Sequence, residues 1–485
     1  MPRFTASQLA AATGGHWVSG EPASVDGFHF DSRIVAPGEM FVALLTGKRD
    51  GHDFLEAALA RGATAALVSR IQPVALPQLV VPDTLAAFQA IARAHRAAWP
   101  HPVVGITGSV GKTSTKDILA HLLGREDCAA TPGNFNNHIG VPMSILRADP
   151  ARHRAMVLEA GTNSPGEIAF LADLIRPTVA IVTAVGPAHL DHLVNLAGVA
   201  VEKAALLQGE PALSIFPAEV ISYEPFQNAP GQVWPVFAGD GPAEPGRVVY
   251  QTTKLEAENN EDVPTRHPDS QVSNYSSLQT TSAPAVGLTI WLPAEVASAE
   301  PLRAPFQSTS EGMARNAALA VAAATYMGVP AAQIEERLAT WQPLADRGGW
   351  VQAEGRSYYV DCYNANPKSF VDSFQAFHQR CPQAPRVFVL GAMFELGAER
   401  ARWHRWVAER CPAQPGDRII LVGEGTEAYL PGLSAFQRAG VMVTHVSSAE
   451  AARDLLKATD YPVYLKGGHA ARLDILAPQP QEVSC

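Results

Sequence analysis

The segment with the clearest chemistry is a glycine-rich loop that follows the apolar run 103–106 and precedes a helical pattern at 112–123. A strand that enters such a loop and leaves it as a helix directs backbone N–H groups, the positive helix end and an ammonium at one polyphosphate. The hydroxyl of Thr113 is predicted to bind Mg²⁺ on the same phosphates. The loop therefore predicts a nucleoside triphosphate site formed by Gly108, Ser109, Val110, Gly111, Lys112, Thr113 and Ser114.

This loop does not by itself identify a reaction. Its spacing is shorter than in the strict P-loop, because Ile106 stands where the first glycine would be. The alternative is a glycine-rich turn that binds nothing, but the strand, the lysine, the threonine and the helix together favour a nucleotide. The motif predicts a phosphoryl donor and leaves the acceptor open.

Apolar runs predict the elements that position the loop. The runs 103–106, 155–158 and 179–184 are separated by helical patterns, which is typical of a parallel sheet covered by helices. Ligands of such sheets collect at the carboxyl ends of the strands. Glu159 and His189 follow the second and third of these runs, so both are expected near the loop.

Two further α/β units flank the central one. The first has helical patterns at 7–13 and 54–62 and strands at 40–45 and 65–68, and it closes near residue 83. Strands in the last third are predicted at 358–360, 386–390, 418–422 and 463–465.

The fold class expected from this organisation is α/β with three domains. The 485 residues correspond to roughly three domains of about 150 residues. We predict a small α/β N-terminal domain (1–85), a central P-loop parallel-sheet domain (86–328) and a C-terminal Rossmann-like domain (329–485).

Residues 239–310 form a polar segment rich in Pro, Ser, Thr, Gln and Asn. We expect loops and edge strands there, with 286–292 as its one convincing strand. A helix is predicted at 314–327, followed by a linker at 328–330.

Composition excludes several classes of protein. Apolar residues make up 47% and charged residues 17% of the chain, which is enough for substantial cores. The formal charge of -10 and the lack of a basic stripe argue against nucleic acid as a partner. An odd count of five cysteines indicates a reducing compartment, and no apolar run is long enough for membrane insertion. We expect a cytoplasmic monomer.

Several motifs together make the chain similar to the Mur ligases, the ATP-dependent amide-forming enzymes of peptidoglycan precursor synthesis. Besides the loop they are Asp31-Ser32-Arg33, the segment 47–54, Asn136-Asn137-His138-Ile139-Gly140, Glu159-Ala160-Gly161, Ala188-His189-Leu190, the segment 361–367 and the segment 390–397. The resemblance covers nearly all of the chain except the polar segment.

The resemblance implies a division of work among three domains. The first would hold a UDP-MurNAc-peptide, the second ATP, and the third would close with an incoming amine, here the dipeptide D-Ala-D-Ala. The γ-phosphoryl of ATP would pass to a substrate carboxylate, and the amine would attack the resulting acyl phosphate. Phosphorylation is needed because a carboxylate repels nucleophiles and has no adequate leaving group, while Mg²⁺ and Lys neutralise charge during transfer.

Residue roles follow from the same resemblance. Thr113, Glu159 and His189 would bind Mg²⁺, and Lys203 would carry a carbamate formed with CO₂; Lys112, His189 and Lys203 are the expected catalytic residues. Without the family, Glu159 reads as a surface carboxylate, His189 as a structural histidine, and Glu202 with Lys203 as an exposed ion pair on a helix.

Other positions are expected to contact the nucleotide or the acid substrate. Asn137, Asn316, Arg347 and Asp361 are assigned to ATP; the alternatives are a helix-surface amide for Asn316 and a strand-end cap for Asp361. The residues assigned to the acid substrate are Ser32, Arg33, Asp50, Gly51, His52, Asn364 and Asn366.

The chain departs from the family pattern on the adenine and amine side. Ala392 replaces an aspartate, residues 311–315 lack a Gly-x-His-Asn pattern, and Lys466-Gly467-Gly468-His469 replaces Lys-Gly-Ser-Arg. Loss of a polar partner can redirect recognition by a few kcal/mol. Two alternatives therefore stay open: a related ligase for another amino acid, and a catalytically impaired nucleotide-binding homologue.

Overall fold

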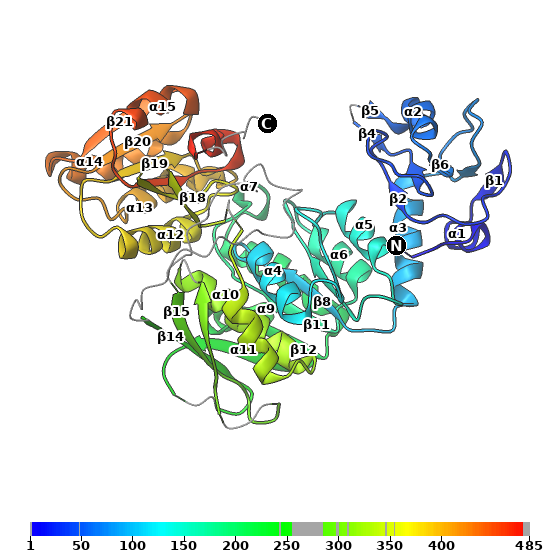
Figure 1. The fold of residues 1–485 in the computed structure, drawn as a ribbon, viewed down its shortest axis with the longest axis horizontal. Coiled ribbons are helices and arrows are strands. Elements are labelled where there is room, and N and C mark those ends of the chain that lie inside the picture. Colours follow the sequence, from blue (N-terminus) through cyan, green and yellow to red (C-terminus); the bar gives the residue numbers. More distant parts are fainter. Residues whose placement is uncertain are drawn as a thin grey trace.

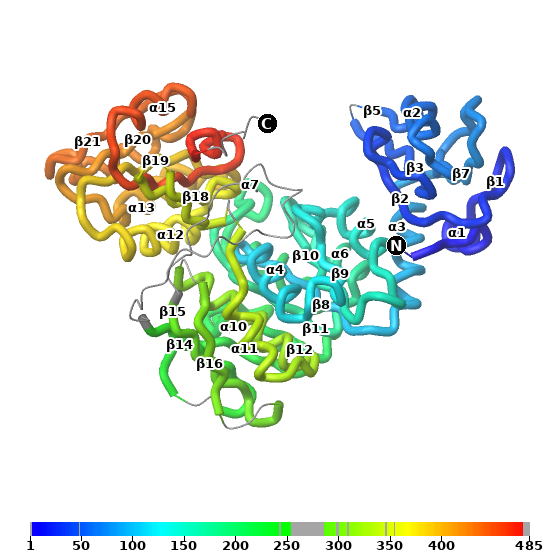
Figure 2. The backbone as a smooth tube through the Cα atoms, in the orientation of Figure 1, coloured from blue at the N-terminus to red at the C-terminus, as the bar shows by residue number. Residues whose placement is uncertain are grey.

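Three large sheets follow one another along the described parts of the chain in the computed structural model, and β4 and β5 form a small two-stranded sheet beside the first. The structure describes residues 2–478 except 48, 242–243, 255–284, 297–299, 308–309, 345–346 and 354. Lys48 of the N-terminal motif and the middle of the polar segment thus lie outside the described residues. The N-terminal and C-terminal units lie at opposite ends of the central unit (Figure 1, Figure 2).

The N-terminal unit is built on a five-stranded sheet with the order β1-β7-β6-β3-β2. All its pairs are parallel except β1 with β7. The predicted strand at 65–68 is confirmed as β6, whereas the one predicted at 40–45 ends early as β3. Its elements are α1 (Ala6–Thr13), β1 (His16–Val18), β2 (Phe28–His29), β3 (Met40–Val42), β4 (Leu45–Thr46), β5 (Arg49–Asp50), α2 (Leu55–Ala60), β6 (Ala65–Val68) and β7 (Gln78–Val80).

The central unit contains a nine-stranded sheet with the order β16-β15-β14-β13-β12-β11-β8-β10-β9. From β9 to β14 all pairs are parallel. Strand β8 lies between β10 and β11 and is buried throughout, as an apolar strand covered on both faces must be. The elements up to β12 are α3 (Thr84–Ala97), β8 (Val103–Thr107), α4 (Lys112–Leu123), β9 (Cys128–Ala130), α5 (Gly140–Arg147), β10 (Ala155–Glu159), α6 (Glu167–Ile175), β11 (Val179–Val182), α7 (Leu190–Leu193), α8 (Leu196–Ala204) and β12 (Leu213–Pro217).

The polar segment contributes more regular structure than predicted. After α9 (Glu224–Gln227) and β13 (Gln232–Ala238), it forms β14 (Val248–Lys254), β15 (Ala285–Trp291) and β16 (Leu302–Gln307), so it holds three strands instead of one. These strands pair antiparallel at one edge of the sheet, as expected for edge strands. In β16, alternate side chains are buried, a period of two that the polar composition obscured.

Two helices link the central sheet to the last unit. Helix α10 (Glu311–Tyr326) packs on α4, and α11 (Ala331–Thr340) packs on β16 and α4. The side chain of His121 in α4 also contacts the carbonyl oxygen of Arg337 at 2.8 Å. Because α11 packs with the central unit, we propose a domain boundary after α11 in place of the one at 328.

The C-terminal unit has a six-stranded sheet with the order β17-β18-β22-β19-β20-β21, parallel except for β17. The four strands predicted in this region correspond to β18, β19, β20 and β22. The elements are β17 (Gly349–Ala353), β18 (Arg356–Asp361), α12 (Pro367–Arg380), β19 (Val387–Gly391), α13 (Arg400–Ala408), β20 (Arg418–Val422), α14 (Leu430–Arg438), β21 (Met442–Val446), α15 (Ala449–Lys457) and β22 (Val463–Lys466).

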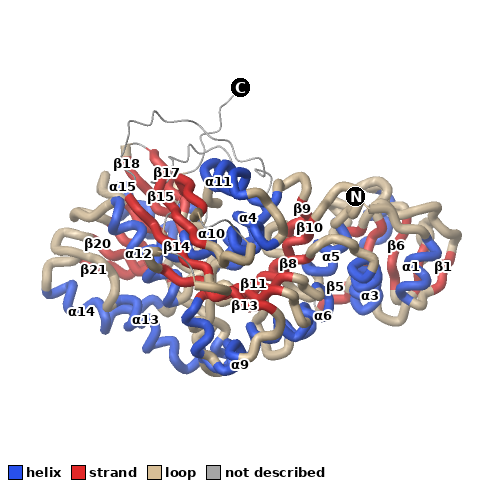
Figure 3. Tube along the Cα trace, turned by 90° about the horizontal axis from the view of Figure 1, so that it is seen from below, coloured by secondary structure: helices blue, strands red, loops and turns tan. Residues whose placement is uncertain are grey.

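Helix α3 connects the N-terminal unit to the central one. It packs on α5 and α6, and the Gln89 side chain donates a hydrogen bond to the carbonyl oxygen of His138 at 2.9 Å. Figure 3 shows α3 beside α5 and α6, between the N-terminal sheet and the central strands. Within the described ranges, no helix combines the length and apolar character needed to cross a membrane.

Candidate active site

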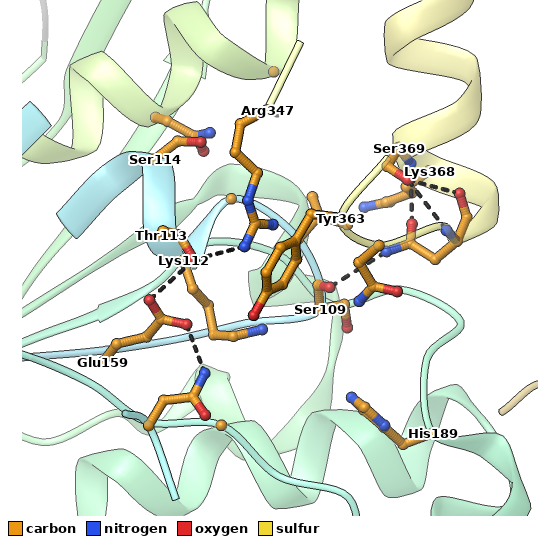
Figure 4. A pocket seen from close by; sticks show the side chains of 18 of the residues that line it. Ser109, Lys112, Thr113, Ser114, Glu159, His189, Arg347, Tyr363, Lys368 and Ser369 are labelled. Atoms are coloured by element: carbon orange, nitrogen blue, oxygen red, sulfur yellow. Dashed lines mark hydrogen bonds between the residues drawn. The ribbon is translucent and has the colours of Figure 1, made fainter. Parts of the chain in front are cut away.

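A cleft of about 1060 Å³ opens between the central and C-terminal units. Its walls come from the phosphate loop after β8, the end of β10, the turn before α7, the first turn of α10, and the segment from β18 into α12. Figure 4 shows side chains from both units pointing into this space. The cleft therefore lies at the carboxyl edge of the central parallel sheet, where ligands of such sheets bind.

Two glycines allow the phosphate loop to lie against its neighbours. Gly108 and Gly111 have φ values of 147° and 85°, which favour glycine. A Cβ at Gly108 would lie 2.1 Å from the hydroxyl oxygen of Thr183, and one at Gly111 would lie 2.5 Å from Oδ1 of Asn316. The loop is thus shaped by close packing on β11 and α10.

Lys112 begins α4, as the sequence predicted. Its Nζ donates a hydrogen bond to the carbonyl oxygen of Gly108 at 2.8 Å, so the ammonium lies over the loop. Burial lowers the pKa of Lys112, while the Glu159 carboxylate acts in the opposite direction. The residue that should neutralise a phosphate is therefore placed beside the backbone that would bind it.

Two of the three predicted Mg²⁺ ligands, Thr113 and Glu159, lie in direct contact. Glu159, the last residue of β10, is 1% exposed, which excludes the surface-carboxylate alternative. One carboxylate oxygen accepts the Thr113 hydroxyl at 3.0 Å and the other accepts Asn136 Nδ2 at 2.8 Å. A hydroxyl and a carboxylate at the mouth of a phosphate loop fit Mg²⁺, which prefers oxygen ligands and substrate phosphates to an all-protein cage.

His189, the third predicted ligand, lines the same cleft but contacts the C-terminal unit. Its Nδ1 lies 2.5 Å from Oε2 of Glu395, and this contact lowers the pKa of Glu395. Figure 4 shows His189 apart from Thr113 and Glu159. Among the described residues, no group of three or more His, Cys, Asp and Glu side chains could hold a metal ion by itself.

The exposed-pair alternative for Glu202 and Lys203 is wrong. Glu202 is 5% exposed and Lys203 is 0% exposed. Lys203 Nζ has no hydrogen-bond partner in the part of the chain that is described. Burial and the positive charge of Lys112 hold the pKa of Lys203 well below its usual value, which favours a neutral, nucleophilic amine.

Three residues assigned to ATP surround the phosphate loop. Asn316 is buried on α10 with its Oδ1 against Gly111, which excludes a helix-surface amide. Arg347 donates to the Thr113 hydroxyl at 3.4 Å and stacks 3.5 Å from the ring centre of Tyr363. Asp361 ends β18 and accepts a hydrogen bond from the buried Lys466.

The asparagines assigned to the site have structural partners as well. Asn137 accepts from the backbone N–H groups of Ile139 and Gly140 before α5. Asn366 caps α12, and its Nδ2 donates to the carbonyl oxygen of Ser109 at 3.4 Å. All of these, together with Ser114 and Asn364, line the cleft.

Five of the residues assigned to the acid substrate, Ser32, Arg33, Asp50, Gly51 and His52, lie on the N-terminal unit, and none of these five lines the cleft. Ser32 is buried, and Arg33 pairs with Asp31, holding the pKa of that carboxyl at about 2. The Asp50 carboxylate accepts the backbone N–H of His52 at 2.9 Å. At Gly51 a Cβ would lie 2.7 Å from the backbone of Ala43, so this turn requires glycine. A substrate reaching both places must extend between units.

Sequence reasoning missed two side chains that line the cleft, Asn136 and Lys466, and one that contacts a lining residue, Glu395. Asn136 was inside a quoted motif, but its neighbour Asn137 was chosen. Lys466 was noted for the residues that follow it, while the pairing of β18 with β22 brings it to Asp361. Glu395 reaches His189 across the unit interface, which no spacing along the chain indicates.

The class defined by this fold and cleft is that of enzymes that use a nucleoside triphosphate at a domain interface. Residues 106–228 match the Mur ligase middle domain, and residues 346–464 match the Mur ligase, glutamate ligase domain. The UDP-N-acetylmuramoyl-tripeptide--D-alanyl-D-alanine ligase of Escherichia coli (strain K12) is 35% identical over 433 residues, which cover 88% of each chain.

Solved structures agree with this match. MurF from Acinetobacter baumannii (crystal structure I) has a TM-score of 0.78 at 25% identity, covering 99% of this chain and 100% of that one. MurF ligase from Thermotoga maritima in complex with ADP has the same fold, with a TM-score of 0.71 at 23% identity over 93% of this chain and 96% of that one. The chain belongs to the Mur ligase family and is an ATP-dependent amide-forming ligase.

Proposed function

We propose that this ligase joins D-Ala-D-Ala to UDP-MurNAc-tripeptide. The observation that carries the proposal is the similarity to the Escherichia coli enzyme of that name over 88% of both chains. The cleft supports it, because Lys112, Thr113 and Glu159 lie together where a triphosphate and its metal would bind. The use of ATP supports action in the cytoplasm.

The described residues suggest how the reaction would proceed. The loop and Lys112 would bind the phosphates and neutralise the γ-phosphoryl, while Thr113 and Glu159 would hold Mg²⁺. The metal, when bound, supplies charge neutralisation on the transferring phosphoryl. Phosphoryl transfer breaks the bond to ADP and forms the acyl phosphate; the amine then forms the amide and phosphate leaves.

Lys203 is proposed to carry a carbamate. Its amine is buried, has no hydrogen-bond partner among the described residues and has a lowered pKa. Attack of the neutral amine on CO₂ forms the N–C bond, and a proton leaves to water. The product is an anion near Lys112, whose positive charge acts on Lys203, so the pairing stabilises both groups.

The loop after β19 differs from the family pattern on the side where the amine would bind. Ala392, which stands where the family carries an aspartate, is 2% exposed in the loop after β19. Phe394 lies in the same loop, and a Cβ added to Gly468 would lie 3.2 Å from its side chain. This side of the site therefore has an apolar methyl in place of a carboxylate. Because this change could alter which amine is bound, other amines should be tested as substrates.

ADP release should depend on both substrates and on Mg²⁺. With UDP-MurNAc-tripeptide present, D-Ala-D-Ala should give a kcat/KM at least about tenfold above that of D-Ala or other single amino acids, because one lost polar contact to the substrate costs about that much. A coupled ADP assay over an amine panel measures this. A higher kcat/KM for another amine would redirect the assignment, and ADP release independent of both substrates would contradict it.

A further inference from the structure

Two consecutive residues of α8, Glu202 and Lys203, are both buried but have opposite surroundings. Lys203 makes no hydrogen bond to the described residues. Glu202, in contrast, accepts from the backbone N–H of Gly166 and of Ile168, each at 2.8 Å, and from the Thr162 hydroxyl at 3.2 Å. The Glu202 side chain is therefore held by hydrogen bonds, whereas the position of the Lys203 side chain depends on the orientation of the α8 backbone.

The segment that Glu202 binds is continuous with the strand that carries Glu159. Residues 160–166 connect the end of β10 to the start of α6. Gly161 in this segment donates its N–H to the carbonyl oxygen of Asn136 at 2.8 Å, and Asn136 itself binds Glu159. Glu202 therefore ties α8 to the part of the sheet edge that positions Glu159.

The hydrogen bonds of Glu202 restrict rotation of α8, the helix that carries Lys203. Helix α8 has only 9 residues, and consecutive side chains on a helix are about 100° apart. If the Glu202 carboxylate is fixed, α8 cannot rotate about its axis without breaking those bonds. The long Lys203 side chain has no polar contact of its own to the described residues that would restore its position.

We propose that Glu202 is a positioning residue that holds α8 so that the Lys203 amine is presented for carbamylation. The inference rests on the proposed carbamate at Lys203. Glu202 neither reacts nor binds the metal; it acts through the backbone of α8 and through the segment after β10.

The variant Glu202→Gln tests this role with little change in shape. An amide NH₂ cannot accept a hydrogen bond, so at least one of the contacts to Gly166, Ile168 and Thr162 is lost. The CO₂ concentration needed for half-maximal carbamylation should rise about tenfold. It is measured from the carbamate signal in ¹³C NMR of the full-length enzyme under ¹³CO₂, without turnover.

Glu167→Gln is the matched control. The Glu167 carboxylate also binds this segment, accepting from the N–H groups of Asn163 and Ser164 at 2.5 and 3.1 Å, but it belongs to α6 and not to α8. This variant should lose stability. Glu167 raises the pKa of Lys203 by its charge, as Glu202 does, so the variant matches the loss of one negative charge and its CO₂ half-saturation should not rise. An equal shift in both variants would show a general structural effect and overturn the inference.

The possible failures are distinguishable. If the wild type gives no carbamate signal, the proposed carbamate itself fails. If the wild type gives it and Glu202→Gln has the same half-saturation, the positioning role is wrong. Should Glu202→Gln not fold, Thr162→Val decides. It removes a hydroxyl whose hydrogen is shared between Glu202 at 3.2 Å and the carbonyl oxygen of Ser164 at 2.8 Å, and its CO₂ half-saturation should rise about twofold; no rise would overturn the proposal.

Discussion

Lys112→Ala is expected to abolish measurable turnover while the protein stays folded. The ammonium lies over the phosphate loop, where it would neutralise the transferring phosphoryl, and loss of one such group lowers kcat by about 100- to 1000-fold. Removal should not unfold the chain, because Lys112 is only partly buried and makes one intramolecular hydrogen bond among the described contacts. Steady-state ADP release and a thermal melt measure the two effects.

Lys116 is the matched control, one turn further along α4. Its Nζ donates to the carbonyl oxygens of Thr131 and Gly133 at 2.7 and 3.4 Å and does not line the cleft. Lys116→Ala should therefore lower stability by about 1–3 kcal/mol without the loss of kcat per folded molecule. Wild-type turnover by Lys112→Ala would refute the assignment of the phosphate loop.

Among the described carboxylates of the cleft, Glu159 is the one whose replacement by Gln should weaken the affinity for Mg²⁺ most strongly. The substitution keeps the shape and the contact with Thr113 but removes a buried charge from the oxygen pair that would hold the metal. We expect the Mg²⁺ concentration for half-maximal activity to rise at least about tenfold. Mn²⁺ binding with a non-hydrolysable ATP analogue, followed by EPR, gives the same comparison without turnover.

A second carboxylate separates a specific effect from a general change in charge. Glu167→Gln removes a negative charge from a residue whose carboxylate is used by backbone N–H groups. Its metal half-saturation should remain within about twofold of the wild type. If Glu159→Gln and Glu167→Gln behave alike, Glu159 is not a metal ligand.

Local sequence patterns were sufficient to predict helices and strands whose residues show the pattern within a single element. Helix α4 has the predicted bounds because the loop glycines end the strand and Lys112 begins an uninterrupted helical pattern. Strand β8 was recognisable because burial on both faces demands a continuous apolar run. The polar segment was harder, because its polar composition obscures the alternation of β14 and of the edge strand β16, and because β14 pairs with β15 across a long stretch of chain.

The sequence motifs predicted which segments form the site, but not which of their side chains contact one another. Nothing in the sequence distinguishes Asn136 from Asn137; the turn before α5 directs one to Glu159 and uses the other as a backbone cap. Glu202 and Lys203 resembled a solvated ion pair because burial of α8 depends on packing against α6. The contact of His189 with Glu395 exists only once the third unit lies on the second.

The proposed reaction passes through an acyl phosphate on the substrate carboxylate. If UDP-MurNAc-tripeptide carries ¹⁸O in its terminal carboxylate, phosphoryl transfer to that oxygen and departure of phosphate must move one ¹⁸O atom into inorganic phosphate. ³¹P NMR of the phosphate released with D-Ala-D-Ala should therefore show the isotope shift in step with amide formation. Amide formation accompanied by unlabelled phosphate would contradict the account.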